Sequence, residues 1–362
     1  MLSSIALAQN GTVEQLFRSA VEAQQHGDFP TAIREYRQLL QLQPDLADAR
    51  ANLGAALAHV GRFDEAVSEY RTALKTDPNN GVIRLNLALA YYKKSDYRSA
   101  ATELDALNAS GSADARIATL LADCYSKLGD DARAVETLAP LQPTHPEDLD
   151  MAFVLGSALT RTGKTAEGAA LLENVAKKGN SADAFLLAGS ALLKRNEKAR
   201  ALSDLEAAMR LKPDLPGLLT QLGIAEEGNG NDTRAEQDLR KAIDSNPNDF
   251  EANVHLGGIL YTRRDLAQAR LYIQRALRIQ PSSTFALYEM ALLNSADGQI
   301  DDAIADLEKV VGADPNWLEA HVQLAALYYK SHRPADGLRE RQVVDRLTAE
   351  QQRQGPHPPA QP

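Results

Sequence analysis

Four basic residues recur along the chain at nearly equal spacing. They are separated by 34, 34 and 33 residues and are Lys93, Lys127, Arg161 and Lys194. Equal spacing places residues at the same point of successive structural repeats, so the four would align as a basic stripe. Such a stripe would bind carboxylates, for example those of an acidic peptide segment. A plainer interpretation is that all four lie near helix C-termini, where the helix dipole favours cations.

The sequence contains no recognisable catalytic or metal-binding arrangement. Its seven histidines form no His-Glu-x-x-His pair, and there is neither a phosphate-binding loop nor a Gly-x-Ser-x-Gly turn. The single cysteine, Cys124, aligns with apolar residues of neighbouring repeats, which predicts a packed side chain rather than a reactive thiol. Asp130 and Asp131, like Asp301 and Asp302, stand beside predicted turns and would cap helices. We therefore expect no enzyme activity, no metal and no cofactor.

A repeat of 34 residues organises almost the whole chain. Turn-forming positions recur with this period, with one step of 33, at Gly27, Gly61, Ser95, Gly129, Gly163, Asn196, Gly230, Arg264, Gly298 and His332. Ten units follow, which start near Val13, Ala47, Gly81, Ala115, Leu149, Ala182, Pro216, Phe250, Thr284 and Leu318. Counted from these starts, positions 8 and 20 always hold Gly or Ala, and position 24 holds a large apolar residue in the first nine units.

These positions predict two helices per unit. Small residues at positions 8 and 20 let the paired helices approach closely, and the large residue at position 24 fills the space beside them. Proline at position 32 ends the second helix in seven units, whereas Ser112 and Asn180 replace it in two, which predicts looser junctions there. One helix pair cannot bury its apolar faces alone, so the pairs must stack into a solenoid.

This pattern resembles the tetratricopeptide-repeat family over residues 13–347. The resemblance implies an all-α, right-handed superhelical solenoid of about ten helix-turn-helix repeats. It also implies that the first helices line a concave groove, mainly through positions 2, 5, 6, 9, 12 and 13. A protein or peptide partner would bind there, and the basic stripe favours a partner with acidic segments.

The resemblance also points to further groove residues. Asn52 and Asn86 occupy position 6, where asparagines of other family members grip peptide backbone, because an amide both donates and accepts. Phe153 and Leu186 occupy position 5 and would form an apolar floor with Leu120, Val154 and Leu187, although ordinary packing between helices is the alternative. The expected site therefore extends from the second to the sixth repeat.

Composition and the termini narrow the remaining possibilities. The formal charge is −10, which argues against a nucleic-acid partner, and no apolar run is long enough to span a membrane. In the N-terminal segment, residues 1–12, Ala6-Leu7-Ala8 has the form of a signal-peptidase site, but the charged and apolar regions that precede such a site are missing. An extracytoplasmic location is favoured over a cytoplasmic one on this triplet alone.

The same triplet motivates an alternative function. The chain would then be a substrate-recruiting or structural subunit of an envelope complex for secretion or polysaccharide export, with catalysis on a separate chain. The last repeat, with Pro334 at its turn and Arg341 at position 24, predicts a polar end cap. Residues 348–362 are rich in Gln and Pro and predict a disordered tail. The oligomeric state is left open.

Overall fold

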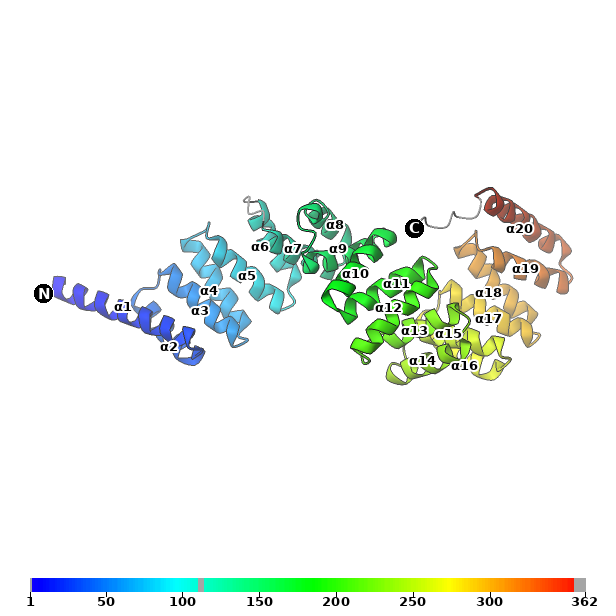
Figure 1. The fold of residues 1–362 in the computed structure, drawn as a ribbon, viewed down its shortest axis with the longest axis horizontal. Helices are drawn as coiled ribbons and strands as arrows, with labels where there is room; N and C mark the ends of the chain where they lie inside the picture. The colour runs from blue at the N-terminus through cyan, green and yellow to red at the C-terminus, as the bar shows by residue number, and fades with distance from the viewer. Residues whose placement is uncertain (1, 110–113, 355–362) are drawn as a thin grey trace. The chain divides into compact units, whose positions relative to one another are not determined.

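The computed structural model describes residues 2–109 and 114–354, and within these ranges the chain contains 20 α-helices, one short 3₁₀ helix and no strand (Figure 1). The helices divide into two compact units, residues 1–180 and residues 181–362. The all-α fold of ten helix pairs that the 34-residue period predicts is confirmed.

The first unit contains five helix pairs. Its elements are α1 (Leu2–Gln25), α2 (Phe29–Leu42), α3 (Ala47–His59), α4 (Phe63–Thr76), α5 (Gly81–Lys93), α6 (Tyr97–Ala109), α7 (Ala115–Lys127), α8 (Asp131–Leu138), the 3₁₀ helix η1 (Gln142–Thr144), α9 (Leu149–Arg161) and α10 (Thr165–Gly179). Each odd-numbered helix packs against the even-numbered helix that follows it, and each even-numbered helix up to α8 packs against the next odd-numbered one.

The second unit repeats the same arrangement. Its elements are α11 (Ala182–Lys194), α12 (Lys198–Leu211), α13 (Leu218–Gly228), α14 (Asp232–Ser245), α15 (Phe250–Thr262), α16 (Leu266–Ile279), α17 (Thr284–Ala296), α18 (Ile300–Ala313), α19 (Leu318–Lys330) and α20 (Pro334–Gln354). Odd-numbered helices also contact each other, as α11, α13, α15 and α17 do in this unit. We call the surface formed by the odd-numbered helices of each unit the first-helix face of that unit.

The turns within the helix pairs have one backbone conformation. All ten turn positions that set the repeat register lie in the left-handed region, with φ between 60° and 87°. Glycine adopts this region without steric cost, which explains why six of the ten are glycine. Ser95, Asn196, Arg264 and His332 adopt it at some cost, because their Cβ atoms approach the following carbonyl.

The core sits between the two helices of each pair. The large side chains of position 24, from Tyr36 and Tyr70 to Leu307, are buried, and so are the small residues of positions 8 and 20. At Gly54 an added Cβ would lie 2.7 Å from the Tyr70 ring, so the aromatic ring occupies the space that the glycine leaves. The positional roles that the sequence predicts are therefore confirmed.

A second set of contacts ties each junction together. The side chains of Arg50, Arg84, Asn253 and His321 occupy position 4, and each donates a hydrogen bond to the carbonyl of the proline that precedes its unit. Arg50 also pairs with Glu69 at 2.8 Å, and Arg84 pairs with Glu103 at 2.8 Å. These bonds link the loop, the first helix and the second helix of one repeat.

Both ends of the array differ from the sequence-based expectation. Helix α1 begins at Leu2, so residues 2–12 extend the first helix of the first repeat rather than forming a separate segment. The predicted signal-peptidase site at Ala6-Leu7-Ala8 lies within this helix, and its cleavage stays a prediction. Helix α20 continues to Gln354, so residues 348–354 are helical where a disordered tail is predicted; residues 355–362 lie outside the described ranges.

The two exceptional junctions differ in how far the structure describes them. Ser112 lies outside the described residues. Asn180 ends α10 in the left-handed conformation, with φ of 47° and its N–H bonded to the Ala176 carbonyl. Asparagine tolerates this conformation better than most residues, so it serves as a helix C-cap where proline is missing.

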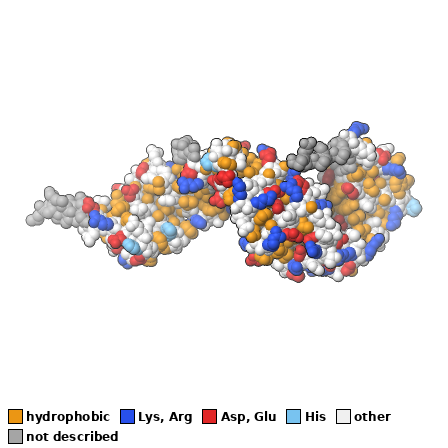
Figure 2. Space-filling view, in the orientation of Figure 1, with side chains coloured by type: hydrophobic (Ala, Val, Ile, Leu, Met, Phe, Trp, Pro, Cys, Tyr) orange, Lys and Arg blue, Asp and Glu red, His pale blue; other side chains and the backbone are white. Residues whose placement is uncertain are grey.

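No helix among the described residues is both long and apolar enough to cross a membrane. The visible face of each unit carries acidic and basic side chains that are interspersed (Figure 2).

Candidate functional site

The first-helix face of the first unit carries a series of pockets. One of them lies between α3 and α5, has a volume of about 400 Å³ and includes both Asn86 and Lys93 in its lining. Its floor is formed by Ala55, Ala58 and the Tyr70 ring. Asn86 is half-buried and Lys93 is exposed, so one pocket contains both an amide and an ammonium group.

A neighbouring pocket of about 430 Å³ contains Asn52, together with Gln24, Gln25 and Tyr36. The hydroxyl of Tyr36 donates to the Gln24 side chain at 3.0 Å, and burial raises the pKa of Tyr36 to about 12, so this phenol stays neutral. His59 lines this pocket and the Asn86 pocket alike, and its ring stacks on Phe29 with centroids 4.6 Å apart. The two pockets therefore adjoin at His59.

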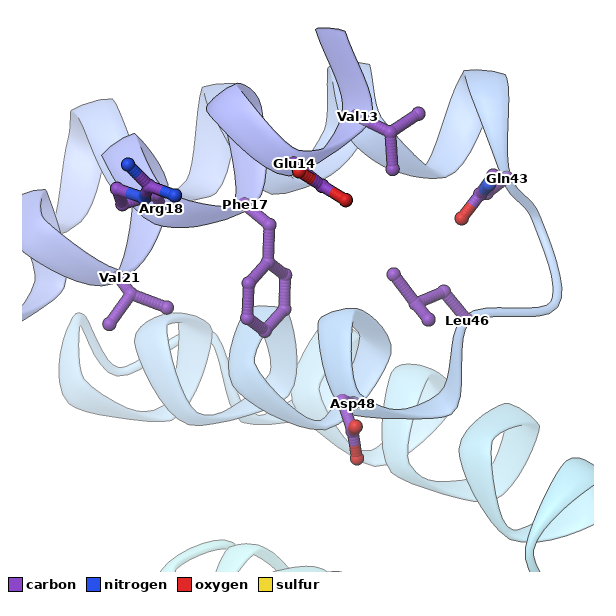
Figure 3. Close-up of a pocket in the computed structure, with 8 residues that line it drawn as sticks. All are labelled: Val13, Glu14, Phe17, Arg18, Val21, Gln43, Leu46 and Asp48. Atoms are coloured by element: carbon purple, nitrogen blue, oxygen red, sulfur yellow. The ribbon is translucent and has the colours of Figure 1, made fainter. Parts of the chain in front are cut away.

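A third pocket, at the N-terminal end of the face, is more apolar. It has a volume of about 550 Å³, and Figure 3 shows Phe17 of α1 between Val21 on one side and Val13 and Leu46 on the other. Glu14, Arg18, Gln43 and Asp48 surround these side chains. Val21 also lines the Asn52 pocket, so all three pockets are contiguous. The sequence analysis missed this one, although Phe17 and Val21 occupy positions 5 and 9 of the first repeat.

An acidic pocket of about 380 Å³ lies further along the same unit, between residues of α5, α7 and α9. Leu120 and Val154, two residues of the predicted apolar floor, line it. Its charged lining is Asp123, Asp148 and Asp150, together with Arg116, which pairs with Asp114 at 2.9 Å. Tyr92 donates a hydrogen bond to Asp123, while Asp148 caps α9 through the Met151 N–H at 2.9 Å.

These carboxylates were not expected from the sequence. Asp123 occupies position 9 and Asp150 occupies position 2, both of which belong to the groove positions of the repeat. The repeat register therefore already places both carboxylates on the groove side of their helices.

The predicted basic stripe does not consist of four equivalent cations. Lys93 and Lys127 are exposed, and none of the described carboxylates lies within ion-pair distance of either ammonium group. Arg161 instead binds both carboxylate oxygens of Asp131, at 2.7 and 2.8 Å. Hydrogen bonding from Arg161 lowers the pKa of Asp131, so this pair is ionised at neutral pH and holds α9 against α8.

The remaining predicted residues lie on two units. Phe153 is half-buried on α9 of the first unit. Leu186 and Lys194 lie on α11, which belongs to the second unit; Leu186 is half-buried and Lys194 is exposed. The pockets that hold predicted residues thus belong to α1, α3, α5, α7 and α9, together with residues of α2 and α4.

The buried thiol behaves as the sequence predicts, but of the four aspartates expected to cap helices only Asp130 does so. Asp131, Asp301 and Asp302 instead lie within the first turns of α8 and α18. Cys124 is fully buried, and burial raises the pKa of its thiol to about 12, which leaves it protonated and unreactive. Asp130 caps α8 through the Arg133 N–H. Across residues 2–109 and 114–354, no group of three or more His, Cys, Asp and Glu side chains is placed to hold a metal ion.

Comparison with known proteins identifies the repeat. Three sequence models described as tetratricopeptide repeat match the chain: one covers residues 17–81, 153–216 and 220–284, a second covers residues 59–124, and a third covers residues 285–316. The first of these alone matches more than half of the chain.

Curated relatives match only part of the chain. The human protein O-mannosyl-transferase TMTC1 is 25% identical over 135 residues, which are 35% of this chain and 15% of that protein. Human tetratricopeptide repeat protein 6 is 30% identical over 95 residues, which are 26% of this chain and 18% of that protein. The chain spans less than a fifth of the length of these relatives.

Among solved structures, a tetratricopeptide repeat protein from Parabacteroides merdae superposes with a TM-score of 0.51 at 16% identity. The match covers 69% of this chain and 99% of that one. At this identity the similarity concerns the fold alone.

Proposed function

Because this chain belongs to the tetratricopeptide-repeat family, we propose that it binds an extended peptide segment of a partner protein along the first-helix face of its first unit. Arrays of this family are typically non-catalytic scaffolds for protein interaction, and that general function holds for this chain. The matched stretch of the O-mannosyl-transferase covers too little of that enzyme for its activity to be transferred.

The observation that carries the proposal is the pairing of Asn86 and Lys93 in one pocket. A half-buried amide can donate to a peptide carbonyl and accept from a peptide N–H, which fixes an extended backbone without reading its sequence. Lys93 supplies a positive charge without a partner among the described residues, which favours an acidic side chain at that point of the bound segment.

The neighbouring pockets extend this surface in both directions along the peptide. Asn52 offers a second amide one repeat earlier, and the apolar pocket around Phe17 offers space for a large apolar side chain. Asp123, Asp148 and Asp150 favour a basic residue at the other end. The preferred segment therefore carries an apolar, then an acidic, then a basic residue along the face, in one chain direction or the other.

The test is selection of peptides from a random phage-displayed library of about 12-residue inserts on the immobilised full chain. The selected peptide is then labelled, and its dissociation constant is measured by fluorescence anisotropy. We expect Asn86→Ala and Lys93→Glu each to weaken binding by about tenfold, which corresponds to one lost charge-assisted or backbone hydrogen bond.

The matched control is Lys75→Glu. Lys75 is also an exposed lysine in the last turn of a helix, but it lies on α4, a second helix. The same charge reversal there has an equivalent interaction with the helix dipole, and it should leave the affinity for the peptide within about twofold of the parent value. Equal effects of the substitutions at Lys75 and Lys93, with no effect of Asn86→Ala, would place binding elsewhere and contradict the proposal.

A further inference from the structure

The second unit carries a different arrangement on its own first-helix face, which the proposed function does not use. Glu227 lies in the last turn of α13, His255 lies on α15, and Glu289 lies on α17. The Nδ1 atom of His255 lies 2.6 Å from a carboxylate oxygen of Glu227, and Glu289 interacts electrostatically with both. We call these three residues, together with Phe285 and Trp317, the Glu289 surface.

Glu289 is the unusual member of the Glu289 surface. Its carboxylate is half-buried, and none of the described residues donates a hydrogen bond to it. Burial, and then repulsion by Glu227, raise the pKa of Glu289 to about 7, while His255 acts in the opposite direction. A half-buried carboxylate without a donor costs stability, which is more typical of binding sites than of structural positions.

Access to this carboxylate is open at Gly258. An added Cβ at Gly258 would lie 3.7 Å from a carboxylate oxygen of Glu289, so the missing side chain leaves the oxygen approachable from that side. Gly258 occupies position 9 of its repeat, where the equivalent residues include Leu89, Asp123 and Leu292. The smallest residue of this column therefore stands beside the carboxylate that lacks a donor.

Aromatic rings flank the same point. Phe285 is 39% exposed, its ring lies 5.6 Å from the His255 ring, and it stacks on Trp317 at 6.3 Å. Tyr288 stacks on the same Trp317 at 5.0 Å. No described arginine lies over the rings of Phe285, Tyr288 or Trp317, although arginines cover other tyrosines of the chain. Trp317 thus packs against both Phe285 and Tyr288, and no cation of the described residues lies on any of the three rings.

The surrounding charge is also negative. Glu251 lies at the start of α15, where it accepts a hydrogen bond from Gln221 at 2.8 Å, and Glu319 lies at the start of α19, where it acts on Tyr288. Both side chains are exposed. The surface thus offers carboxylates and aromatic rings together. Glu227 is paired with His255 and Glu251 with Gln221, but Glu289 has no hydrogen-bond donor among the described residues.

We propose that the Glu289 surface binds a lysine or arginine side chain of a basic segment in a partner protein. The cationic head would donate to Glu289 and Glu227, and its alkyl stem or guanidinium plane would lie on Phe285. The chain's own residues 355–362 do not fit this role, because they contain no lysine and no arginine. The site is independent of the peptide site proposed for the first unit, so either can fail alone.

The test uses the full chain and a fluorescein-labelled probe peptide of about 15 residues built from Gly-Arg-Ser repeats. Matching peptides with Gln or Glu in place of Arg serve as ligand controls. At pH 8 and about 0.05 M salt, where surface charges are weakly screened, we expect the Arg peptide to bind and the Gln and Glu peptides not to bind. Equal anisotropy with the Arg and Gln peptides would overturn the proposal.

Three variants locate the binding. Glu289→Gln keeps the shape and removes the charge, and it should weaken binding of the Arg peptide by about tenfold. Phe285→Leu keeps an apolar side chain but removes the ring, and it should weaken binding by about threefold to fivefold. The control is Glu206→Gln, the same charge change at an exposed residue of α12, with an expected effect below about twofold.

Two outcomes would count against the inference. If Glu206→Gln weakens binding as much as Glu289→Gln, the peptide responds only to the net charge of −10. If the parent dimerises in sedimentation and Glu289→Gln abolishes the dimer, the surface binds a second copy rather than a basic partner. Asn86→Ala should leave Arg-peptide binding unchanged, which separates this test from that of the first unit.

Discussion

The two units have the same fold but present different chemistry on their first-helix faces. In the first unit the Asn86 pocket combines one amide, three alanines and a lysine that has no described partner, and we propose that it binds a peptide backbone and a carboxylate. In the second unit the Glu289 surface combines carboxylates with stacked aromatic rings, so it is suited to a cation. Because the core positions of the repeat are the same in both, the surface positions can diverge without a change of fold.

Comparing the two units also distinguishes residues that stabilise every repeat from a residue that lowers the stability of one repeat. Positions 8, 20 and 24 are filled in the same way in both units, and their side chains are buried, apart from the exposed Arg341 of the last repeat. Glu289 is different, because it holds a charge in a place where the fold supplies no donor. Such a residue suggests selection for binding rather than for folding.

The largest expected effect concerns helix packing, where we compare Gly168 of the first unit with Gly312 of the second. An added Cβ at Gly168 would lie 2.6 Å from the Gly156 carbonyl oxygen and 2.9 Å from the Thr160 backbone nitrogen, whereas nothing lies within 4 Å of one at Gly312. We expect Gly168→Ala to lower the free energy of unfolding by about 2 kcal/mol, because backbone atoms cannot easily give way.

The same substitution at Gly312 should raise stability by about 0.5–1 kcal/mol, because alanine has the higher helix propensity and the space is open. Urea denaturation followed by circular dichroism measures both changes. If Gly168→Ala were also stabilising, the close approach of α9 and α10 would be wrong.

The second prediction concerns the cost of Glu289. In the folded chain this carboxyl holds its proton up to about pH 7, but in the unfolded chain it loses it near the ordinary value of 4.5. The folded state therefore binds more protons between these values, so this group lowers stability as the pH rises from about 4.5 to 7. We expect Glu289→Gln to stabilise the chain at pH 8 by about 1–3 kcal/mol.

This gain should vanish near pH 4, where the carboxyl is protonated in both states and resembles the amide. The measurement is the urea midpoint at both pH values, with Glu206→Gln as the control for a general charge effect. A stabilisation of equal size at both pH values would show that packing, rather than charge, is responsible.

The smallest expected effect concerns the basic stripe of the first unit. Arg161 is paired with Asp131, whose side chain is 14% exposed, while the arginine side chain is 46% exposed. We expect Arg161→Gln to lower stability by about 0.5–1 kcal/mol, because exposed ion pairs contribute little. Lys127→Gln, without a described partner, should change stability by less than about 0.5 kcal/mol.

The pH dependence tests the same pair. The pKa of Asp131 is lowered by Arg161, so its contribution is present above the ordinary value of 3.8 and is lost as the pH falls through the lowered value. The difference between parent and Arg161→Gln should therefore shrink in strong acid. If Lys93→Glu weakens peptide binding and Arg161→Gln does not, then Lys93 serves binding whereas Arg161 serves the packing of α9 on α8.

Much of the architecture could be predicted from the sequence because the repeat is local. Eight of the ten first helices begin at the predicted residue, from Ala47 in the second repeat to Leu318 in the last repeat. The exceptions are α1, which begins at Leu2, and α13, which begins at Leu218 after Gly217 adopts a left-handed conformation. The repeat period cannot predict where the first helix of the array begins, or that the helix predicted to start at Pro216 starts two residues later.

The candidate sites were predicted only in part. Asn52, Asn86 and Lys93 line pockets of the first-helix face, but the aspartates beside them and the Glu289 surface were missed. His255 and Glu289 stand in the same repeat column as Asn52, yet no column shows that Glu227 reaches His255 at 2.6 Å from the preceding repeat. Contacts between neighbouring repeats connect residues at different repeat positions, so they depend on how the two helices are offset along their axes.

What the sequence determined by itself is therefore the period, the helix pairs and the core, because turn conformation and helix packing constrain residue type at fixed intervals. What only the tertiary structure decided is which charges are already satisfied. Arg161 and Lys127 occupy the same position of the repeat, but of the two only Arg161 reaches a described carboxylate. In the sequence Glu289 looks like any other glutamate, and only the folded structure shows that it is half-buried without a described hydrogen-bond donor. Partners of a charged side chain come from other repeats, and their distances arise only when the helices are stacked.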